Sequence, residues 1–140
     1  MVAKEIAMCI QMAAGWYDVP APLLEAIHAV EGGYVGHSRE NTNGSKDYGP
    51  MQINSLWVPG LAAELGASEA TIRINLQNNA CFNVAVGARI VKSHLDKTSD
   101  PVQAVGQYHS RTPHLRDSYS NKVVKQLRTI MSKRAKQDNE

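Results

Sequence analysis

The 140-residue sequence contains no run of apolar residues that approaches the ~20 needed to span a bilayer. Its first five residues also lack the basic-then-apolar pattern of a secretory signal sequence. We therefore expect either a cytoplasmic protein or a mature chain whose leader was removed and replaced by Met1.

The sequence also lacks a large excess of charge of either sign, because the net charge is +2 and the sequence pI is about 8.6. Nucleic-acid-binding domains carry a clustered basic face, which so mild an excess does not indicate. We interpret the basic residues of the last third as a solvated helix face and a frayed tail, with a weak attraction to an anionic cell wall as the alternative. These residues are Lys122, Lys125, Arg128, Lys133, Arg134 and Lys136.

Cysteine occurs only twice, at Cys9 and Cys81. If the two pair, they close a loop of about 73 residues, and the chain-entropy model gives roughly 4 kcal/mol of stabilisation. A disulfide would also indicate an oxidising compartment such as a periplasm. The alternative is two buried free thiols, which are common in core helices.

Apolar residues at helical spacing dominate what the sequence does contain. Hydrophobic residues make up 43% of the chain, which is enough for the core of a single domain over 1–132. The polar segment 35–50 predicts a long loop or a small irregular hairpin, after which Met51, Ile53, Leu56 and Trp57 should dock on the core. We expect a mainly α-helical domain followed by a disordered tail over 133–140. The expected helices cover 4–16, 20–31, 59–66, 68–75 (capped by Ser68), 79–95, 101–108 and 116–132.

Glu31 is the residue that breaks a local rule. It lies in the last turn of its helix, where the macrodipole is negative and cations are preferred. It also follows Val30 at the edge of the apolar stripe. Both circumstances penalise the charged form and should raise the pKa of the carboxyl, so that Glu31 could serve as a general acid near neutral pH. The alternative is an ordinary helix-end glutamate paired with a nearby Lys or Arg.

His28 lies three residues before Glu31, so the two side chains can share one helix face. Such a pair can be half of a metal site, whose remaining ligands would come from His37, His109 or His114. None of these histidines has a spacing that specifies a metal. We therefore expect no metal, and we interpret His28 as hydrogen-bonded to backbone or to a carboxylate.

The segment that follows the polar loop is distinctive, because residues 43–57 read Asn-Gly-Ser-Lys-Asp-Tyr-Gly-Pro-Met-Gln-Ile-Asn-Ser-Leu-Trp. This segment resembles the Gly-x-Met-Gln-Ile motif of lytic transglycosylases with a soluble-transglycosylase (SLT) type catalytic domain. In that family a helix-ending glutamate precedes the motif, as Glu31 does here. Further matches follow in family order: residues 83–95 resemble the central helix, 104–108 resemble Ala-x-x-x-Tyr-Asn, and Tyr119 with Lys122 and Val123 resembles Tyr-x-x-Lys-Val.

The resemblance implies a lysozyme-like α-helical fold and a defined activity. The family cleaves the β-1,4 bond between N-acetylmuramic acid and N-acetylglucosamine in peptidoglycan and leaves a 1,6-anhydromuramoyl end. It implies that Glu31 is the catalytic residue, acting first as acid and then as base, without a metal or organic cofactor. The resemblance implies that Gln52 and Tyr108 bind the sugar or orient the glutamate, and that Met51 and Tyr119 line the groove. The further candidates for substrate binding are Asp47, Asn54 and His109.

The branch that the chain resembles most comprises small enzymes that accompany secretion, conjugation or pilus machines. Its members have one cysteine in the first helix and another before the central helix, which implies a disulfide between Cys9 and Cys81. The resemblance also implies a periplasmic or exported protein whose leader is absent from this chain, and a monomer is the default expectation. Its expected partners are peptidoglycan strands and such a machine, with no nucleic acid.

The sequence departs from the family pattern beside two of these residues. The family usually has serine after the glutamate, whereas here Gly32 follows Glu31. The family usually has asparagine after the tyrosine, whereas here His109 follows Tyr108. We expect the acid to keep its role with a different set of hydrogen-bond partners or with reduced activity.

Two rival functions stay open at this point. Asp47 lies 16 residues after Glu31 in a segment that resembles the second-carboxylate segment of animal-type lysozymes. Two carboxylates about 5–5.5 Å apart would suit a retaining muramidase that uses water, although we favour Asp47 as a residue that turns the loop before Gly49. The other rival is a non-catalytic glycan-binding or assembly subunit, and the presence of Glu31, Gln52 and Tyr108 together argues against it.

Overall fold

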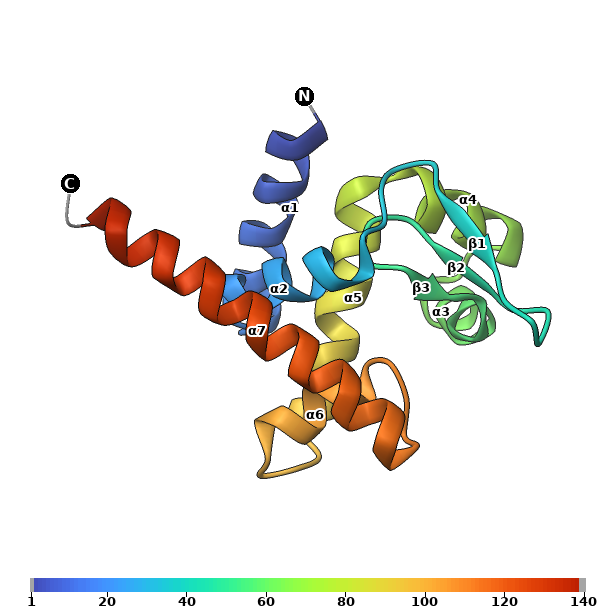
Figure 1. Ribbon diagram of the computed structural model, residues 1–140. Coiled ribbons are helices and arrows are strands. Elements are labelled where there is room, and N and C mark those ends of the chain that lie inside the picture. The colour runs from blue at the N-terminus through green and yellow to red at the C-terminus, as the bar shows by residue number, and fades with distance from the viewer. Residues whose placement is uncertain (1, 139–140) are drawn as a thin grey trace.

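The computed structural model describes residues 2–138, which form seven α-helices, a short 3-10 helix and a three-stranded sheet (Figure 1). The prediction of a mainly α-helical domain is confirmed. The elements in chain order are α1 (Val2–Tyr17), α2 (Ala21–Glu31), β1 (Ser38–Glu40), β2 (Lys46–Tyr48), β3 (Ile53–Asn54), η1 (Ser55–Trp57), α3 (Val58–Leu65), α4 (Glu69–Asn78), α5 (Ala80–Leu95), α6 (Pro101–Gln107) and α7 (Pro113–Asp138). None of the helices within 2–138 combines the length and apolar character needed to cross a membrane.

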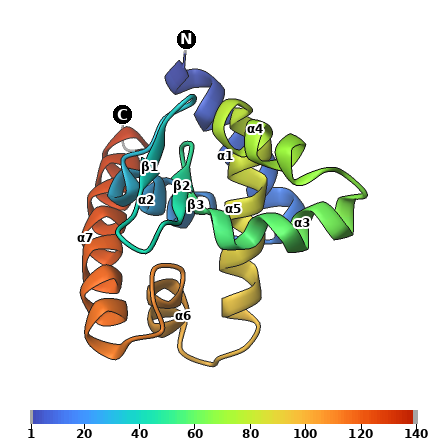
Figure 2. The same cartoon turned by 90° about the vertical axis from the view of Figure 1, so that its right-hand side faces the viewer.

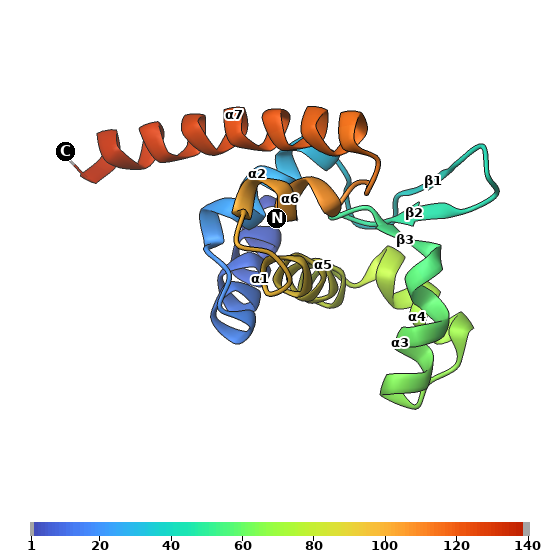
Figure 3. The same ribbon diagram turned by 90° about the horizontal axis from the view of Figure 1, so that it is seen from below.

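Helix α5 runs through the centre of the domain, with α1 packed along it and α7 crossing over α2 and α6 (Figures 1 and 3). Its sequence explains this position, because small and branched apolar residues recur on nearly every side of it and are buried. Side-chain caps mark where helices begin: Asn79 accepts a hydrogen bond from the Phe82 N–H at 3.0 Å, and Ser68 caps α4 as predicted.

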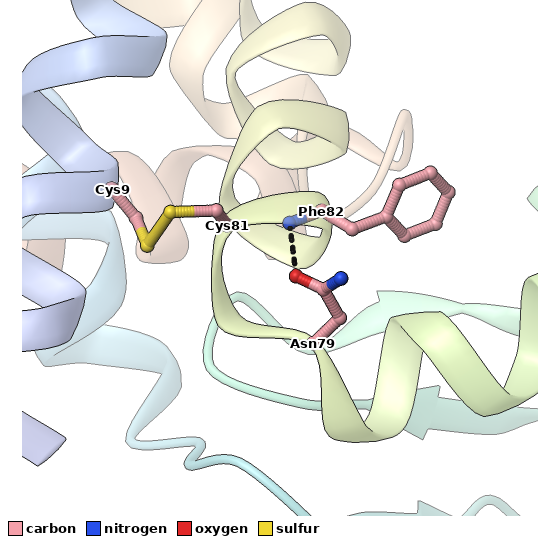
Figure 4. Close-up of a disulfide and its surroundings, with 4 residues drawn as sticks. All are labelled: Cys9, Asn79, Cys81 and Phe82. Atoms are coloured by element: carbon pink, nitrogen blue, oxygen red, sulfur yellow. Dashed lines mark hydrogen bonds between the residues drawn. A yellow bond between two sulfur atoms is a disulfide. The ribbon is translucent and has the colours of Figure 1, made fainter.

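A disulfide joins Cys9 of α1 to Cys81 at the start of α5, with the two Cα atoms 4.8 Å apart (Figure 4). The pairing that the resemblance implied is therefore present. The bond ties the first helix to the central one close to the Asn79 cap. Because the two cysteines are 72 positions apart, it closes about half of the chain into one loop.

The polar segment after α2 forms a hairpin, which was one of the two predicted alternatives. Strands β1 and β2 pair antiparallel with Arg39 opposite Asp47, and β3 adds a third strand with Asn54 opposite Asp47. The sheet is small because each strand has only two or three residues. Its function in the fold is to carry polar side chains beside the end of α2.

The last helix is longer than the sequence predicted, since α7 runs from Pro113 to Asp138. The expected disorder over 133–140 is therefore wrong for residues 133–138, and residues 139–140 lie outside the described part of the chain. Arg134 donates a hydrogen bond to the Glu25 carboxylate of α2, which anchors the late turns to the body. Residues 133–136 are also good helix formers, which helps to explain why α7 continues through them.

Candidate active site

A cleft of about 500 Å³ lies between the sheet and the region where α5, α6 and the start of α7 meet. Figure 2 shows the sheet above α6, with α7 and α5 on either side. One wall, here called the sheet wall, is formed by Arg39, Asn41, Asn43, Ser45, Asp47, Asn54, Leu56 and Trp57. The opposite wall, here called the helix wall, is formed by Ile90, Ser93, His94, Lys97, Gln107, Tyr108, His109, Ser110 and Arg111, while Glu31, Gln52 and Ile53 complete the lining.

Glu31 reaches this cleft because it is the last residue of α2. Gly32 ends the helix in the left-handed conformation with φ 66°, and its N–H bonds to the His28 carbonyl at 2.9 Å. The Tyr119 hydroxyl of α7 donates a hydrogen bond to Glu31 Oε2 at 2.6 Å. The carboxyl is thus held from behind by a residue 88 positions later in the chain.

Burial raises the pKa of the Glu31 carboxyl from an ordinary 4.5 to about 7. The Tyr119 hydrogen bond opposes this shift because it stabilises the carboxylate, and Arg39 opposes it through its positive charge. The negative charge of Asp47 raises the pKa further. The direction agrees with the sequence prediction, and a carboxyl with this pKa can give up and take back a proton near neutral pH.

Tyr119 is fixed by an aromatic stack. Its ring lies parallel to His109, with centroids 5.0 Å apart, and near Tyr108 at 6.3 Å. It is only 5% exposed and is not among the residues that line the cleft. The prediction that Tyr119 lines the groove is therefore wrong, because the side chain supports Glu31 from the interior. Burial and the nearby Glu31 raise the pKa of Tyr119, which keeps the hydroxyl protonated as a donor.

Met51 was also predicted to line the groove, and this prediction is wrong. Its side chain is fully buried and packs against Gly87 of α5, where an added Cβ would lie 3.1 Å from three atoms of Met51. Only its backbone faces the site: the Met51 carbonyl accepts a hydrogen bond from the Tyr108 hydroxyl at 2.7 Å. Tyr108 lines the cleft and at the same time ties the helix wall to this loop.

Asn83 of α5 holds the same loop, and the sequence reasoning gave it no such role. Its Oδ1 accepts from the Met51 N–H at 2.8 Å, and its Nδ2 donates to the carbonyls of Tyr48 and Leu76 at 2.7 and 2.8 Å. Asn83 is completely buried. A polar side chain on the apolar face of the predicted helix 79–95 was the available signal, since buried amides need partners.

Gln52 lies next to Met51 and lines the cleft. It adopts a left-handed conformation with φ 51°, which costs energy for a residue other than glycine. Its side-chain Nε2 donates to the Gly49 carbonyl at 2.9 Å. Gly33 also packs tightly here, because a Cβ on it would lie 2.1 Å from the Gly49 oxygen. The loop and the end of α2 are therefore held close together.

Asp47 lines the cleft, but its carboxylate is already occupied by donors from the sheet wall. Arg39 forms an ion pair with it at 3.1 Å, Asn41 donates to the same oxygen at 3.2 Å, and Asn54 donates to the other oxygen at 3.0 Å. Asn54 also caps η1 by accepting from the Leu56 N–H. Asp47 and Asn54 thus form one polar network along the sheet wall.

The sequence also singled out His109, His28, Leu56 and Trp57. His109 lines the cleft, and burial followed by the charge of Lys122 lowers its pKa. His28 lies with Nε2 3.2 Å from the Gly33 carbonyl, in agreement with its predicted backbone hydrogen bond. Leu56 and Trp57 are 78% and 42% exposed at the sheet wall, so the prediction that they dock on the core is wrong.

Comparison with known proteins shows which family the chain is similar to. The family model of the transglycosylase SLT domain matches residues 8–129, which is most of the chain. Among curated proteins, Protein IpgF of Shigella flexneri is 35% identical over 107 residues, covering 76% of this chain and 67% of that protein. Invasion protein IagB of Salmonella typhimurium is 30% identical over 141 aligned positions, covering 95% of this chain and 83% of that protein.

Proposed function

This chain belongs to the transglycosylase SLT domain family, whose fold is lysozyme-like and mainly α-helical, and from this premise we propose that it is a peptidoglycan lytic transglycosylase. The proposed substrate bond is the β-1,4 linkage between N-acetylmuramic acid and N-acetylglucosamine. The observation that carries the proposal is the half-buried Glu31 carboxyl in the cleft, with a pKa of about 7 and a hydrogen bond from Tyr119.

In the first proposed step, protonated Glu31 donates its proton to the glycosidic oxygen as the bond to C1 breaks. The electron pair of that bond leaves with the N-acetylglucosamine oxygen, and the positive charge at C1 is carried by the substrate's own N-acetyl group or by an oxocarbenium ion. Glu31 is then a carboxylate, and the Tyr119 hydroxyl at 2.6 Å stabilises its negative charge.

In the second step, the 6-hydroxyl of the muramoyl residue attacks C1 and its proton passes to the Glu31 carboxylate. The new bond makes the 1,6-anhydro ring, and the acid returns to its starting form. No water is consumed, so one carboxyl with a pKa near the working pH is sufficient. We propose that Gln52, Asn54, Asp47 and His109 contact the glycan along the cleft, since all four line it.

The muramidase alternative would need Asp47 as a nucleophile beside Glu31. Three donors already hold the Asp47 carboxylate, which favours a structural role in the sheet wall. Replacing Asp47 by Asn tests this, because a nucleophile cannot be replaced by an amide, whereas a structural residue can keep part of its hydrogen bonds. The transglycosylase proposal predicts that this variant keeps measurable cleavage, and complete loss would favour the muramidase.

The direct test of the catalytic proposal is Glu31→Gln in an assay of soluble fragments released from purified peptidoglycan. The amide keeps the size of the side chain and can still accept from Tyr119, but it has no proton to donate. We expect cleavage to fall by about a thousandfold or more. The matched control is Glu40→Gln, which removes an exposed carboxylate on β1. Unchanged cleavage in the Glu31 variant would overturn the catalytic role of Glu31, whereas no cleavage by the wild type itself would favour a glycan-binding subunit.

We further propose that the protein works in a periplasm or after export, as a monomer, beside a secretion, conjugation or pilus machine. The disulfide supports an oxidising compartment. The name of the Salmonella relative, Invasion protein IagB, supports a link to such a machine. Fractionation of cells that make the protein would test the compartment, with the thiol state of Cys9 and Cys81 as the second readout.

A further inference from the structure

The helix wall of the cleft carries cations that the proposed cleavage reaction does not use. Lys97 lies just after the end of α5, and Arg111 lies in the link between α6 and α7. Both line the cleft and both are exposed. Two separate segments of the chain therefore bring a positive charge to the same wall.

These two cations differ from the other cation of the cleft. Arg39 on the sheet wall is neutralised by its ion pair with Asp47 at 3.1 Å. Among the ion pairs formed within the described residues, none involves Lys97 or Arg111. The helix wall also contributes no acidic side chain to the lining. No ion pair within the described residues therefore holds either of these two cations.

His94 shows that the two charges act at one place. Its side chain lies on the same wall, one turn before Lys97, and is 8% exposed. Burial lowers the pKa of His94, and the charges of Lys97 and Arg111 lower it further. Lys97 and Arg111 therefore act on the same imidazole and leave a region of positive potential that faces the cleft.

We propose that Lys97 and Arg111 form a carboxylate-binding subsite for the side chain of the muramoyl residue, an inference that rests on the proposed function. The guanidinium of Arg111 matches a carboxylate in a planar, two-point geometry, and the Lys97 ammonium adds a mobile point charge. In peptidoglycan this carboxylate has two sources. A peptide-free muramoyl residue exposes its lactyl carboxylate, and a peptide-bearing one exposes the carboxylates of its stem peptide.

The subsite would select the reacting sugar by charge. N-acetylglucosamine is neutral, so only the muramoyl residue of each disaccharide carries the group that the helix wall attracts. A strand bound with a muramoyl side chain on this wall would be positioned along the cleft in one register relative to Glu31. A neutral polymer of N-acetylglucosamine would lack this contact.

The experiment measures binding in the Glu31→Gln background, where the strands stay intact. The three ligands are chitohexaose, which is neutral, peptide-free glycan strands with lactyl carboxylates, and uncrosslinked peptide-bearing strands. The test variant adds Lys97→Gln and Arg111→Gln. The control variant adds Lys125→Gln and Arg128→Gln, which removes the same formal charge from exposed positions of α7 that do not line the cleft.

We expect the test variant to lose affinity by about tenfold for carboxylate-bearing strands and by much less for chitohexaose, with a weaker salt dependence than its parent. Loss for peptide-free strands alone identifies the lactyl carboxylate, and loss for peptide-bearing strands alone identifies the carboxylates of the stem peptide. Loss for both kinds of strand shows that the subsite binds either carboxylate. An equal loss for chitohexaose, no loss for any strand, or the same loss in the control variant would overturn the subsite.

This result is independent of the cleavage assay. If the protein with Glu31 releases no fragments but the binding pattern holds, the proposed activity fails and the subsite stands. If fragments are released but Lys97 and Arg111 make no difference to binding, the subsite alone fails.

Discussion

Replacing Glu31 by Gln should stabilise the folded protein at high pH, even though it should abolish cleavage. The folded state keeps the carboxyl protonated up to a pKa of about 7, whereas the ordinary value is 4.5. Between these two values the unfolded chain has lost a proton that the folded chain still holds. The free energy of unfolding of the wild type must therefore fall as the pH rises through this window, and it levels off above the folded pKa.

The size of the effect follows from the same shift. A difference of roughly 2.5 pKa units at about 1.4 kcal/mol per unit amounts to about 3 kcal/mol once Glu31 is fully ionised. The amide of Gln has no such penalty. The difference in unfolding free energy between Glu31→Gln and wild type should therefore grow by about 3 kcal/mol from about pH 4 to about pH 8.

Urea unfolding followed by tryptophan fluorescence and by circular dichroism measures this difference at each pH. Comparing two pH values cancels the contribution of the amide itself, since that contribution does not titrate. The control Glu40→Gln, at an exposed strand position, should show no growth of this size. A difference that stays constant with pH would refute the conclusion that burial perturbs Glu31.

Three further predictions concern the groups that support the site. Tyr119→Phe removes the donor that stabilises the Glu31 carboxylate, so carbon-detected NMR titration of Glu31 should show a pKa about one unit or more higher; an unchanged value would contradict the hydrogen bond. Asn83→Ala removes the side-chain partner of three backbone groups in a buried region and should cost about 3 kcal/mol or more in urea unfolding, and a loss below about 1 kcal/mol would contradict that role. Replacing Cys9 and Cys81 by alanine should lower the free energy of unfolding by about 4 kcal/mol in the same assay, whereas an unchanged midpoint would show that the closed loop contributes nothing.

The helices and the catalytic candidate could be predicted because both depend on local signals. Apolar spacing located the helices, and the left-handed Gly32 ends α2 where the Gly-Gly pair predicted. Glu31 stood out because an acid at the end of a helix beside an apolar stripe is unfavourable. Its place beside the apolar stripe agrees with its partial burial, and burial is the main cause of its raised pKa.

Contacts between distant segments could not be predicted in the same way. Tyr119 was expected in the groove, but its position behind Glu31 depends on how α7 crosses α2. Met51 looked like a groove residue by its place in the motif, yet its side chain fills the space that Gly87 leaves in α5. Such outcomes depend on which helix faces which, and a single sequence does not report this.

The shared location of the two cations on the helix wall could not be predicted from the sequence either. Lys97 and Arg111 lie in short connections whose composition carries no periodic signal, so nothing in the sequence distinguished them from other surface charges. Only the packing of α5 against α6 brings the two connections to one wall.

Mass spectrometry of the fragments released from purified peptidoglycan tests the central proposal most directly. If the muramoyl 6-hydroxyl attacks C1 and Glu31 takes its proton, the fragments carry 1,6-anhydromuramoyl ends and are lighter by one water than hydrolysed fragments. Fragments that carry only reducing ends would contradict the transglycosylase mechanism and would identify water as the acceptor.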